Sequence, residues 1–483
     1  MTSTTPEPTP SPVASSPVAA SVSSAGHDGA TTGQVDVVVI GGGFAGLAAA
    51  HRLRDQGLSV RVLEARDRVG GRTMTEQTEH GAVDLGGQWL GPGQTRMYEL
   101  VAQLGAETYP MNVRGASVLH VDGRRTTYPG VIPRVPRPWG LGVLGLTMAR
   151  VNRMAATIDV NRPWACRHAE QWDRQTLGDW LHRNVPSRWA RELLEIAITS
   201  VMAVPPAEIS LLHALFYVAS AGSLELLVES EGGAQQDRVV GGMQSLAERF
   251  AAGLGDALVL GAPVAAVEED GAGVVVHGAG GAGWRCRRVV CTAPPPLVRA
   301  LTFSRPLSPA RRALLERLPM GSAMKCFALY REPFWRAAGL SGQAVINEWP
   351  VRTLFDASGA GDRPAALMGF AEGNDARTLA GLPEAERRAA VVAAFVKVYG
   401  EAAAHPIGYL DRYWGDEAWS GGCYAAVRPP GTWVGFGNLL AEPHGAVHFA
   451  GTETATVWHG YIEGAVRSGE RAADEALAAL RRS

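Results

Sequence analysis

The fold is decided by the segment Val35-Asp-Val-Val-Val-Ile-Gly-Gly-Gly-Phe-Ala-Gly46. Its first six residues are mostly β-branched, which is typical of a buried parallel strand, and a glycine loop follows at once. Residues 47–54 then have the pattern of a helix that ends near Gly57, and residues 58–63 that of a second strand ending at Glu64. This order predicts the βαβ unit that opens a Rossmann-like domain.

The glycine loop has the spacing of a dinucleotide-binding site. Gly41 permits a tight turn, Gly43 permits the backbone to approach a pyrophosphate, and Gly46 permits the helix to pack against the strand. Phosphates would lie at the N-terminus of the helix, where unpaired N–H groups point toward them. Glu64 follows eighteen residues after Gly46, and a carboxylate at that strand end can accept hydrogen bonds from ribose hydroxyls. Nicotinamide and flavin dinucleotides both meet these requirements.

Further strands and helices are expected around this unit. Helical spacing dominates residues 135–230. Strands are expected at 258–260, 265–267, 274–276, 288–292, 322–330, 344–349, 365–370 and 447–451, and helices at 383–400 and 460–480. Segments of cofactor-binding type stand at the start, middle and end of the chain, separated by two different insertions. We therefore predict an α/β fold of two interleaved domains, one Rossmann-like and one that binds substrate through a mixed sheet and helices.

The predicted domain boundaries are discontinuous. Residues 1–34 are rich in Ser, Thr, Pro and Ala, and we expect them to form a disordered tail. The cofactor-binding domain would comprise residues 35–115, 239–300 and 420–483, and the substrate-binding domain residues 116–238 and 301–419.

Composition excludes several classes of function. The chain has 483 residues, a net charge of −2 and no basic tract, so nucleic acid is not an expected partner. Its five cysteines are irregularly spaced, which argues against a disulfide framework and a zinc site, and no metal is expected. No signal-peptide pattern is visible, and no apolar run reaches the roughly 18 residues that span a membrane. We expect a cytoplasmic protein that does not associate with membranes.

Four later motifs narrow the choice of dinucleotide. They are Val69-Gly-Gly-Arg-Thr73, the segment from Met320 to Trp335 that contains Lys325, Trp419-Ser-Gly-Gly-Cys-Tyr424, and the segment from Gly451 to Tyr461. Together with the glycine loop they resemble the flavin monoamine oxidase family, in its soluble bacterial form, over about residues 35–478. The resemblance implies that the dinucleotide is FAD and that the Rossmann-like domain is an FAD-binding domain.

The resemblance also implies roles for individual residues. Lys325 would hold a water molecule against the flavin, and Tyr424 and Tyr461 would form an aromatic cage, whose faces attract an amine. Cys423 would be bonded covalently to the flavin. The other residues matched to contacts with FAD are Ala45, Arg72 at the pyrophosphate, Val264 at the adenine, Trp414, Thr452 and Glu453. Leu227 lies in the segment that gates the substrate cavity in the family.

The implied reaction is the oxidative deamination of an amine to an aldehyde, ammonia and hydrogen peroxide, with oxygen as the acceptor. A primary aromatic monoamine such as tyramine or phenylethylamine is the leading substrate. A diamine, polyamine or cyclic amine is the alternative, and Glu229, Glu231 or Glu348 could then bind a distal ammonium group. An L-amino acid is a third possibility, but it would require an arginine for its carboxylate. A homodimer is expected from the resemblance alone.

A non-catalytic flavoprotein and a nicotinamide-dependent reductase are the rivals from other functional classes. The joint presence of Lys325, Tyr424 and Tyr461 argues against the first. Flavin absorbance of the purified protein would decide against the second.

Overall fold

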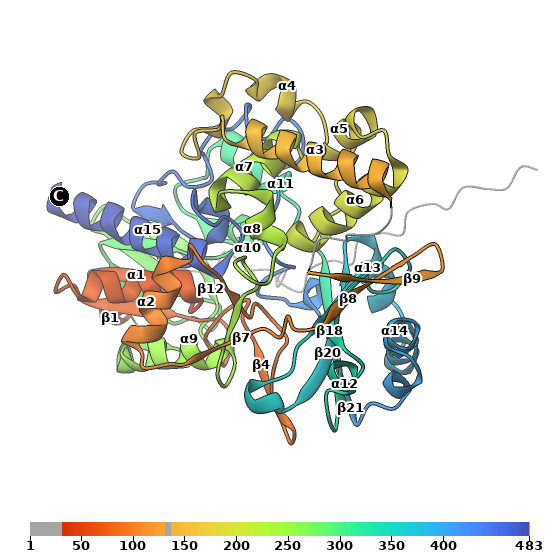
Figure 1. Ribbon diagram of the computed structural model, residues 1–483. Helices are drawn as coiled ribbons and strands as arrows, with labels where there is room; N and C mark the ends of the chain where they lie inside the picture. The colour runs from red at the N-terminus through yellow and green to blue at the C-terminus, as the bar shows by residue number, and fades with distance from the viewer. Residues whose placement is uncertain (1–30, 131–136, 483) are drawn as a thin grey trace, which may run out of the picture.

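The computed structural model describes residues 31–130 and 137–482. Its central element is a five-stranded parallel sheet whose strands come from distant parts of the chain (Figure 1). In spatial order these are β11 (Leu258–Val259), β3 (Val60–Leu63), β2 (Val37–Ile40), β15 (Arg288–Cys291) and β22 (Val447–Phe449). Helix α1 (Phe44–Arg54) follows β2 directly, and the predicted βαβ opening is therefore confirmed.

The two faces of this sheet are covered by different layers. Val37 and Val39 of β2 contact a cluster that includes α1 and the last helix, α15 (Ile462–Arg482). Val38 and Ile40 contact a second sheet instead, as the alternation of side chains along a strand requires. Helices α1 and α15 pack closely, since a Cβ added at Gly469 would lie 2.0 Å from the carbonyl oxygen of Ala45.

The second sheet has five strands and begins inside the predicted tail. Its order is β1 (Thr31–Gln34), β14 (Gly283–Cys286), β13 (Val274–Gly278), β12 (Val264–Glu269) and β16 (Thr302–Phe303). The prediction of disorder for residues 1–34 is wrong for residues 31–34, because their backbone pairs in parallel with β14. Residues 1–30 lie outside the described residues.

A seven-stranded mixed sheet lies beside these layers (Figure 1, lower right). Its order is β21 (Gly408–Tyr413), β17 (Ala323–Tyr330), β20 (Ala365–Glu372), β19 (Thr353–Asp356), β18 (Leu340–Ile346), β8 (Ala116–Val121) and β9 (Arg124–Pro129). Only the β18–β8 pair is parallel. The other strands form two small sheets. One has the order β6 (Trp89–Leu90), β10 (Asp237–Val239) and β7 (Thr108–Pro110), and the other pairs β4 (Thr75–Thr78) with β5 (Gly81–Asp84).

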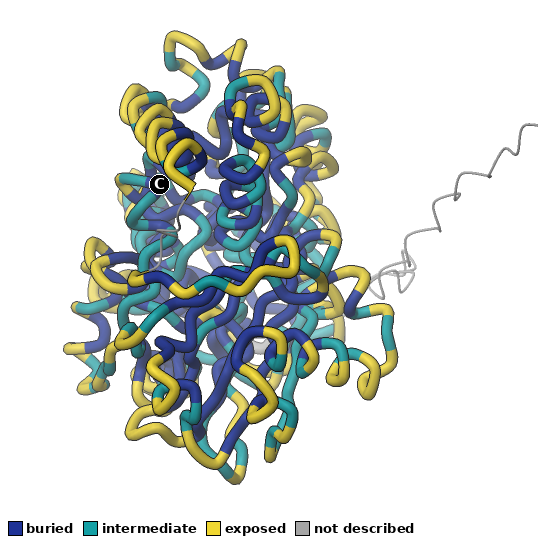
Figure 2. The backbone as a smooth tube through the Cα atoms, turned by 45° about the vertical axis from the view of Figure 1, so that its right-hand side comes forward, coloured by how far each residue is buried: buried dark blue, intermediate teal, exposed yellow. Residues whose placement is uncertain are grey.

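Six helices form a group at the top of Figure 1, as the helical pattern of residues 135–230 predicted. They are α3 (Pro138–Ala155), α4 (Ala169–Asp173), α5 (Leu177–Asn184), α6 (Arg188–Met202), α7 (Leu211–Ala221) and α8 (Leu224–Val228). The remaining helices are α2 (Thr95–Gln103), α9 (Met243–Ala252), α10 (Pro295–Ala300), α11 (Pro309–Glu316), α12 (Phe334–Ala337), α13 (Asn374–Ala380) and α14 (Glu384–Tyr399). Figure 2 shows buried segments, drawn in dark blue, in both the upper and the lower part of the molecule.

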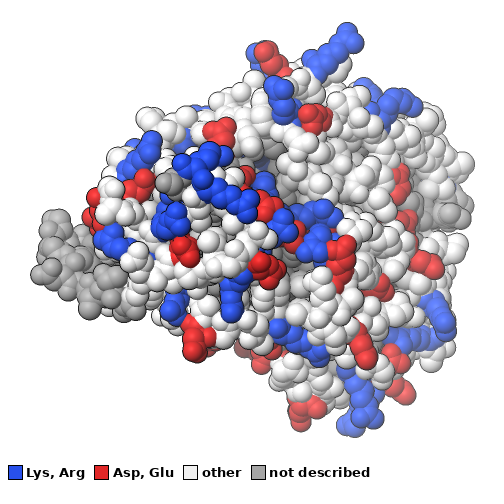
Figure 3. Space-filling view, turned by 90° about the vertical axis from the view of Figure 1, so that its left-hand side faces the viewer, with Lys and Arg blue, Asp and Glu red and all other residues white. Residues whose placement is uncertain are grey.

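The predicted α/β class and most predicted elements are confirmed. The strand expected at 344–349 lies earlier, as β18. Several further strands were not predicted, among them the hairpin β8–β9 and strands β14, β19 and β21. The predicted domain boundaries stay a prediction, although the parallel sheet does combine strands from three separate segments. Within residues 31–130 and 137–482, no helix is long and apolar enough to cross a membrane. In the face drawn in Figure 3, acidic and basic side chains are interspersed.

We predict that Gly46→Ala destabilises the protein strongly. A Cβ at this position would lie 1.9 Å from the carbonyl oxygen of Gly41, so the loop or the helix must move. Overpacking of this kind costs about 1–3 kcal/mol, and the melting temperature should fall. Gly142→Ala is the matched control, because its Cβ meets open space on α3. Equal melting temperatures for the two variants would contradict this account of the loop.

Candidate active site

One cavity of about 1060 Å³ connects the glycine loop with the C-terminal tyrosines. Thirteen of the residues singled out in the sequence line it: Gly41, Gly43, Ala45, Glu64, Arg72, Leu227, Val264, Lys325, Trp414, Cys423, Tyr424, Thr452 and Tyr461. Gly46 and Glu453 do not line it. The sequence motifs, which are hundreds of residues apart, therefore meet at a single cavity.

The glycine loop is shaped by close backbone contacts. Gly41 has a φ of +106°, and a Cβ there would lie 2.4 Å from the Thr292 hydroxyl oxygen. Gly43 precedes α1 and provides no side-chain cap, and Gly43 and Ala45 face the cavity. The first N–H groups of an eleven-residue helix are thus directed to the cavity without a capping side chain, which suits a phosphate group.

Glu64 is held at the end of β3 by the loop itself. Its Oε2 accepts a hydrogen bond of 2.6 Å from the Gly42 amide, and its Oε1 accepts one of 2.9 Å from the Arg66 amide. The side chain is buried and still lines the cavity. This position fits the predicted contact with ribose hydroxyls.

Arg72, which is half-buried, forms an ion pair with the buried carboxylate of Glu453. The two N–O distances are 2.5 Å and 3.0 Å, and Arg72 also donates to the carbonyl oxygen of Tyr424 at 2.8 Å. Burial alone would raise the pKa of Glu453, but the adjacent guanidinium holds it below its usual value. Glu453 therefore lies behind Arg72, and only the arginine reaches the cavity.

Lys325 is a buried lysine in the middle of β17. Its ammonium donates to the carbonyl oxygens of Asp84 at 2.6 Å and Gly86 at 2.9 Å, and to Oε1 of Gln88 at 2.7 Å. Burial lowers its pKa to about 7. An ammonium has three N–H groups, so all three are directed to protein acceptors. A water molecule bound to Lys325 would have to replace one of these three acceptors. Gln88 is the acceptor that could give way, because it accepts through its side chain and the other two through backbone carbonyls.

Cys423 is buried in the cavity wall, directly before Tyr424 in the chain. Its amide donates to the carbonyl oxygen of Gly321 at 3.0 Å, and its side chain packs near Trp414 and Ala323. The Trp414 indole is fixed by a hydrogen bond of 2.9 Å to the carbonyl oxygen of Leu85. Burial raises the pKa of the Cys423 thiol to about 12.

Tyr424 and Tyr461 are both half-buried in the cavity wall. Tyr424 meets the ring of Phe370 edge-on with centroids 6.2 Å apart. Tyr461 lies 5.0 Å from Trp458 and 6.0 Å from Tyr217, again measured between ring centroids. Burial raises the pKa of both phenols, so both stay protonated and present uncharged rings.

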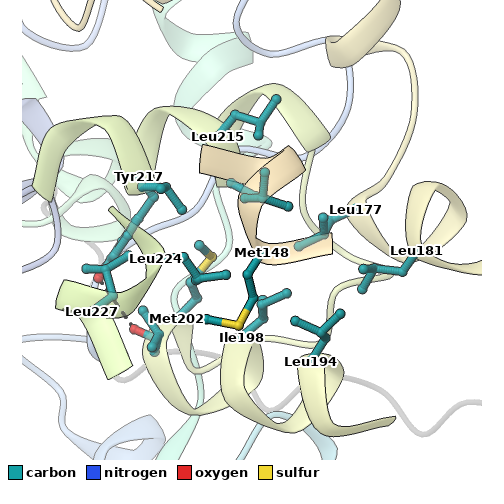
Figure 4. Close-up of a cluster of buried hydrophobic side chains, with 14 of the residues drawn as sticks. Met148, Leu177, Leu181, Leu194, Ile198, Met202, Leu215, Tyr217, Leu224 and Leu227 are labelled. Atoms are coloured by element: carbon teal, nitrogen blue, oxygen red, sulfur yellow. Dashed lines mark hydrogen bonds between the residues drawn. The ribbon is translucent and has the colours of Figure 1, made fainter. Parts of the chain in front are cut away.

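The part of the cavity lined by the helical group is mostly apolar, although Gln235 and Gln343 also line the cavity. Figure 4 shows Tyr217, Leu224 and Leu227 on one side of this helical cluster and Met148, Leu194 and Ile198 on the other. All six residues line the cavity. Ser200 and Thr353 add two hydroxyl groups to the wall, with their oxygens 2.9 Å apart. The sequence singled out Leu227 alone among these residues, because the others have ordinary core or helix patterns.

The three acidic residues considered for a distal ammonium do not line this cavity. Glu348 pairs with Lys397 at 2.6 Å, and Glu231 is exposed. Glu229 is half-buried. Burial raises the pKa of the Tyr128 phenol, and the nearby charge of Glu229 raises it further. Among the described residues that line the cavity, the carboxylates are Glu64 and Glu268, on the cofactor-binding elements.

Residues 44–477 match the protein-family model described as "Flavin containing amine oxidoreductase". This chain belongs to the flavin-containing amine oxidase family. The resemblance stated from the motifs is therefore confirmed, and the chain is an amine oxidoreductase that uses FAD.

Relatives of this amine oxidase differ in the substrates they are named for. This chain is 41% identical over 449 residues to the Mycobacterium tuberculosis protein named "Putative flavin-containing monoamine oxidase AofH". The match covers 92% of this chain and 97% of the relative. A putrescine oxidase solved with bound putrescine is 33% identical with a TM-score of 0.89, and the match covers 92% of this chain and 99% of that one. A cyclohexylamine oxidase from Brevibacterium oxydans is 34% identical with a TM-score of 0.87 and the same coverage.

We predict that Arg72→Met destabilises this amine oxidase more than the double variant Arg72→Met/Glu453→Gln. The single change leaves a buried carboxylate without its partner, which costs about 3–5 kcal/mol. The double change removes the uncompensated charge. Thermal unfolding of the two variants and the wild type measures the difference. Losses that simply add in the double variant would show that the pair is not coupled.

Proposed function

We propose that this amine oxidase deaminates primary aromatic monoamines such as phenylethylamine and tyramine. The products would be the aldehyde, ammonia and hydrogen peroxide, with oxygen as the electron acceptor. The observation that carries this proposal is the apolar wall of the cavity beyond Tyr424 and Tyr461, where the lining side chains include Leu194, Ile198 and Leu227. An aryl ring gains free energy by leaving water for such a surface.

The residues of the cofactor end fit FAD. Gly41, Gly43 and Ala45 would face the pyrophosphate at the uncapped start of α1, and Glu64 the ribose. Val264 would contact the adenine, while Arg72, Trp414 and Thr452 would lie along the rest of the cofactor. FAD, when bound, accepts the two electrons and the hydrogen that the amine loses and passes them to oxygen.

The protein's own residues would position the amine and keep water away. Tyr424 and Tyr461 would flank the reacting nitrogen as the aromatic cage. The apolar walls favour the neutral form of the amine, because burial disfavours its charged form. Lys325, fixed by its three acceptors, would place a buried amino group near the flavin.

The other substrate classes are less well supported. An amino-acid carboxylate would need a free arginine, but Arg66 and Arg72, which line the cavity, are already paired with Glu64, Glu417 and Glu453. Diamines would need a carboxylate in the apolar part. A cyclic amine is the second candidate, because a saturated ring suits the same apolar wall and a relative is named for cyclohexylamine.

The two-domain division is part of the proposal. The cofactor-binding segments supply the parallel sheet and the glycine loop, while β17, β19, β20 and helices α6 to α8 supply the wall of the apolar part. A homodimer remains a prediction that light scattering of the purified protein can test.

We predict that the purified protein releases hydrogen peroxide fastest with phenylethylamine and tyramine, more slowly with cyclohexylamine, and at least about tenfold more slowly with putrescine. The reason is the cost of burying a second ammonium group without a partner. Peroxide release measured at equal amine concentrations is the test. A preference for putrescine or spermidine would contradict the proposed substrate class while leaving amine oxidation intact.

We further propose that Cys423 is bonded covalently to the flavin, and predict that Cys423→Ala makes the flavin extractable. Acid precipitation should leave the flavin with the wild-type protein and release it from the variant. Cys166→Ala is the matched control, because Cys166 is a half-buried cysteine that does not line the cavity. Release of flavin from the wild-type protein would overturn the covalent bond.

A further inference from the structure

Two hydroxyl groups, those of Ser200 and Thr353, stand in the mostly apolar wall of the active-site cavity. Ser200 belongs to α6 and is half-buried, whereas Thr353 begins β19 and is buried. Both residues line the cavity, and their hydroxyl oxygens lie 2.9 Å apart. This hydrogen bond joins the helical group to the seven-stranded sheet at the cavity wall. The proposed function does not yet use it.

The side chains next to this hydroxyl pair are apolar. Thr353 is paired with Val345 of β18 and with Phe370 of β20, and paired residues place their side chains on the same face of a sheet. On α6, Ala197 lies three residues before Ser200 and therefore on the same face of the helix. Val345, Phe370 and Ala197 all line the cavity. The pair is thus a polar spot within an apolar surface.

The hydroxyl pair lies one aromatic ring away from the cage. Phe370, the cross-strand neighbour of Thr353, meets the ring of Tyr424 edge-on with centroids 6.2 Å apart. Cβ atoms of directly opposite residues in such a strand pair are about 4.5–5.5 Å apart. A substrate ring that extends from the cage along Phe370 therefore meets the hydroxyl pair at its far edge.

The pair can take a further hydrogen bond whichever hydroxyl is the donor. Each hydroxyl has one O–H and two lone pairs, and the contact between them uses one O–H and one lone pair. Burial raises the pKa of the nearby Glu372 carboxyl and the Ser200 hydroxyl opposes that rise, so the second O–H can point toward Glu372. Even then, the lone pairs of Thr353 remain. A ligand group that donates a hydrogen bond suits both arrangements.

Gln235 and Gln343 are the rival polar groups on this wall. The amide of Gln343 donates to the Ser230 hydroxyl at 3.1 Å, and that of Gln235 to the carbonyl oxygen of Leu227 at 2.9 Å. Oε1 of Gln235 has no hydrogen-bond partner among the described residues. An amide oxygen only accepts, whereas two hydroxyls can both accept and donate. The hydroxyl pair therefore matches a ligand hydroxyl in both directions.

We propose that Ser200 and Thr353 form a subsite for a hydroxyl group at the far edge of the substrate's ring. The preferred substrates are then ring-hydroxylated arylalkylamines such as tyramine, ahead of unsubstituted ones such as phenylethylamine. The phenol donates its O–H to a lone pair of the hydroxyl pair, which removes the cost of burying a phenol without a partner. The apolar neighbours contact the faces of the ring. The inference rests on the proposed function.

The wild-type holoprotein tests this subsite without any substitution. Tyramine, 4-methylphenylethylamine and phenylethylamine share one ammonium group and one linker, and hydroxyl and methyl groups are similar in size. We expect kcat/KM, measured from peroxide release, to be about tenfold higher for tyramine than for the other two, because of the additional hydrogen bond. The difference should lie mostly in KM, since the subsite is remote from the C–H bond that breaks.

The double variant Ser200→Ala/Thr353→Val removes both hydroxyls and nearly keeps the shape of the wall. The preference should reverse in favour of 4-methylphenylethylamine, because a phenol would be buried unpaired while a methyl group gains from apolar contact. Thr199→Val is the matched control, since it removes a hydroxyl from the same helix at a residue that does not line the cavity. This control should keep the wild-type preference. If the double variant does not fold, Thr353→Val alone replaces it.

Each contrary result has a distinct meaning. Equal kcat/KM values for the three amines in the wild type would overturn the subsite, while their oxidation would leave the proposed function standing. A tyramine preference that survives in the double variant would overturn it and leave Oε1 of Gln235 as the acceptor. A loss by the same factor for all three amines would show a merely structural role, and would also overturn it. Oxidation of none of them by the wild type would contradict the proposed function as well.

Discussion

The ion pair between Arg72 and Glu453 is the constraint on which the active site depends. It joins residues 381 positions apart, one on a glycine turn near the start of the chain and one before the last helix. The same guanidinium donates to the Tyr424 carbonyl, and the same carboxylate accepts from the Ala426 amide. One charged contact therefore ties Cys423 and Tyr424 to the cofactor end, and the Glu453 side chain, which is 3% exposed, cannot be solvated in place of its arginine.

Burial acts on the other ionisable groups of the cavity in a common direction. It lowers the pKa of Lys325 to about 7 and raises that of the Cys423 thiol to about 12, so each group is driven toward its neutral form. The apolar wall beyond the tyrosines acts on an amine in the same way. A cavity with these properties suits chemistry that begins with a neutral amine.

Short sequence patterns predicted many of the residues that line the cavity. The glycine loop, Glu64, Lys325 and the Cys423–Tyr424 pair are each recognisable within a few residues, and the cavity brings them together. Ser200, Thr353 and Tyr217 could not be found in that way. Their places in the wall depend on how α6, α7 and β19 meet in space, and each has the local pattern of an ordinary helix or strand. The three acceptors around Lys325 could not be predicted from the sequence either, because two of them are backbone carbonyl oxygens.

The most direct test of amine oxidation at this cavity is the visible spectrum of the purified holoprotein during an anaerobic titration with phenylethylamine. The account predicts that the flavin absorbance is bleached stoichiometrically and returns when air is admitted, with about one hydrogen peroxide released per flavin. Tyr424→Ala and Tyr461→Ala should slow the bleaching without abolishing the flavin spectrum. A flavin absorbance that no amine changes would contradict the account.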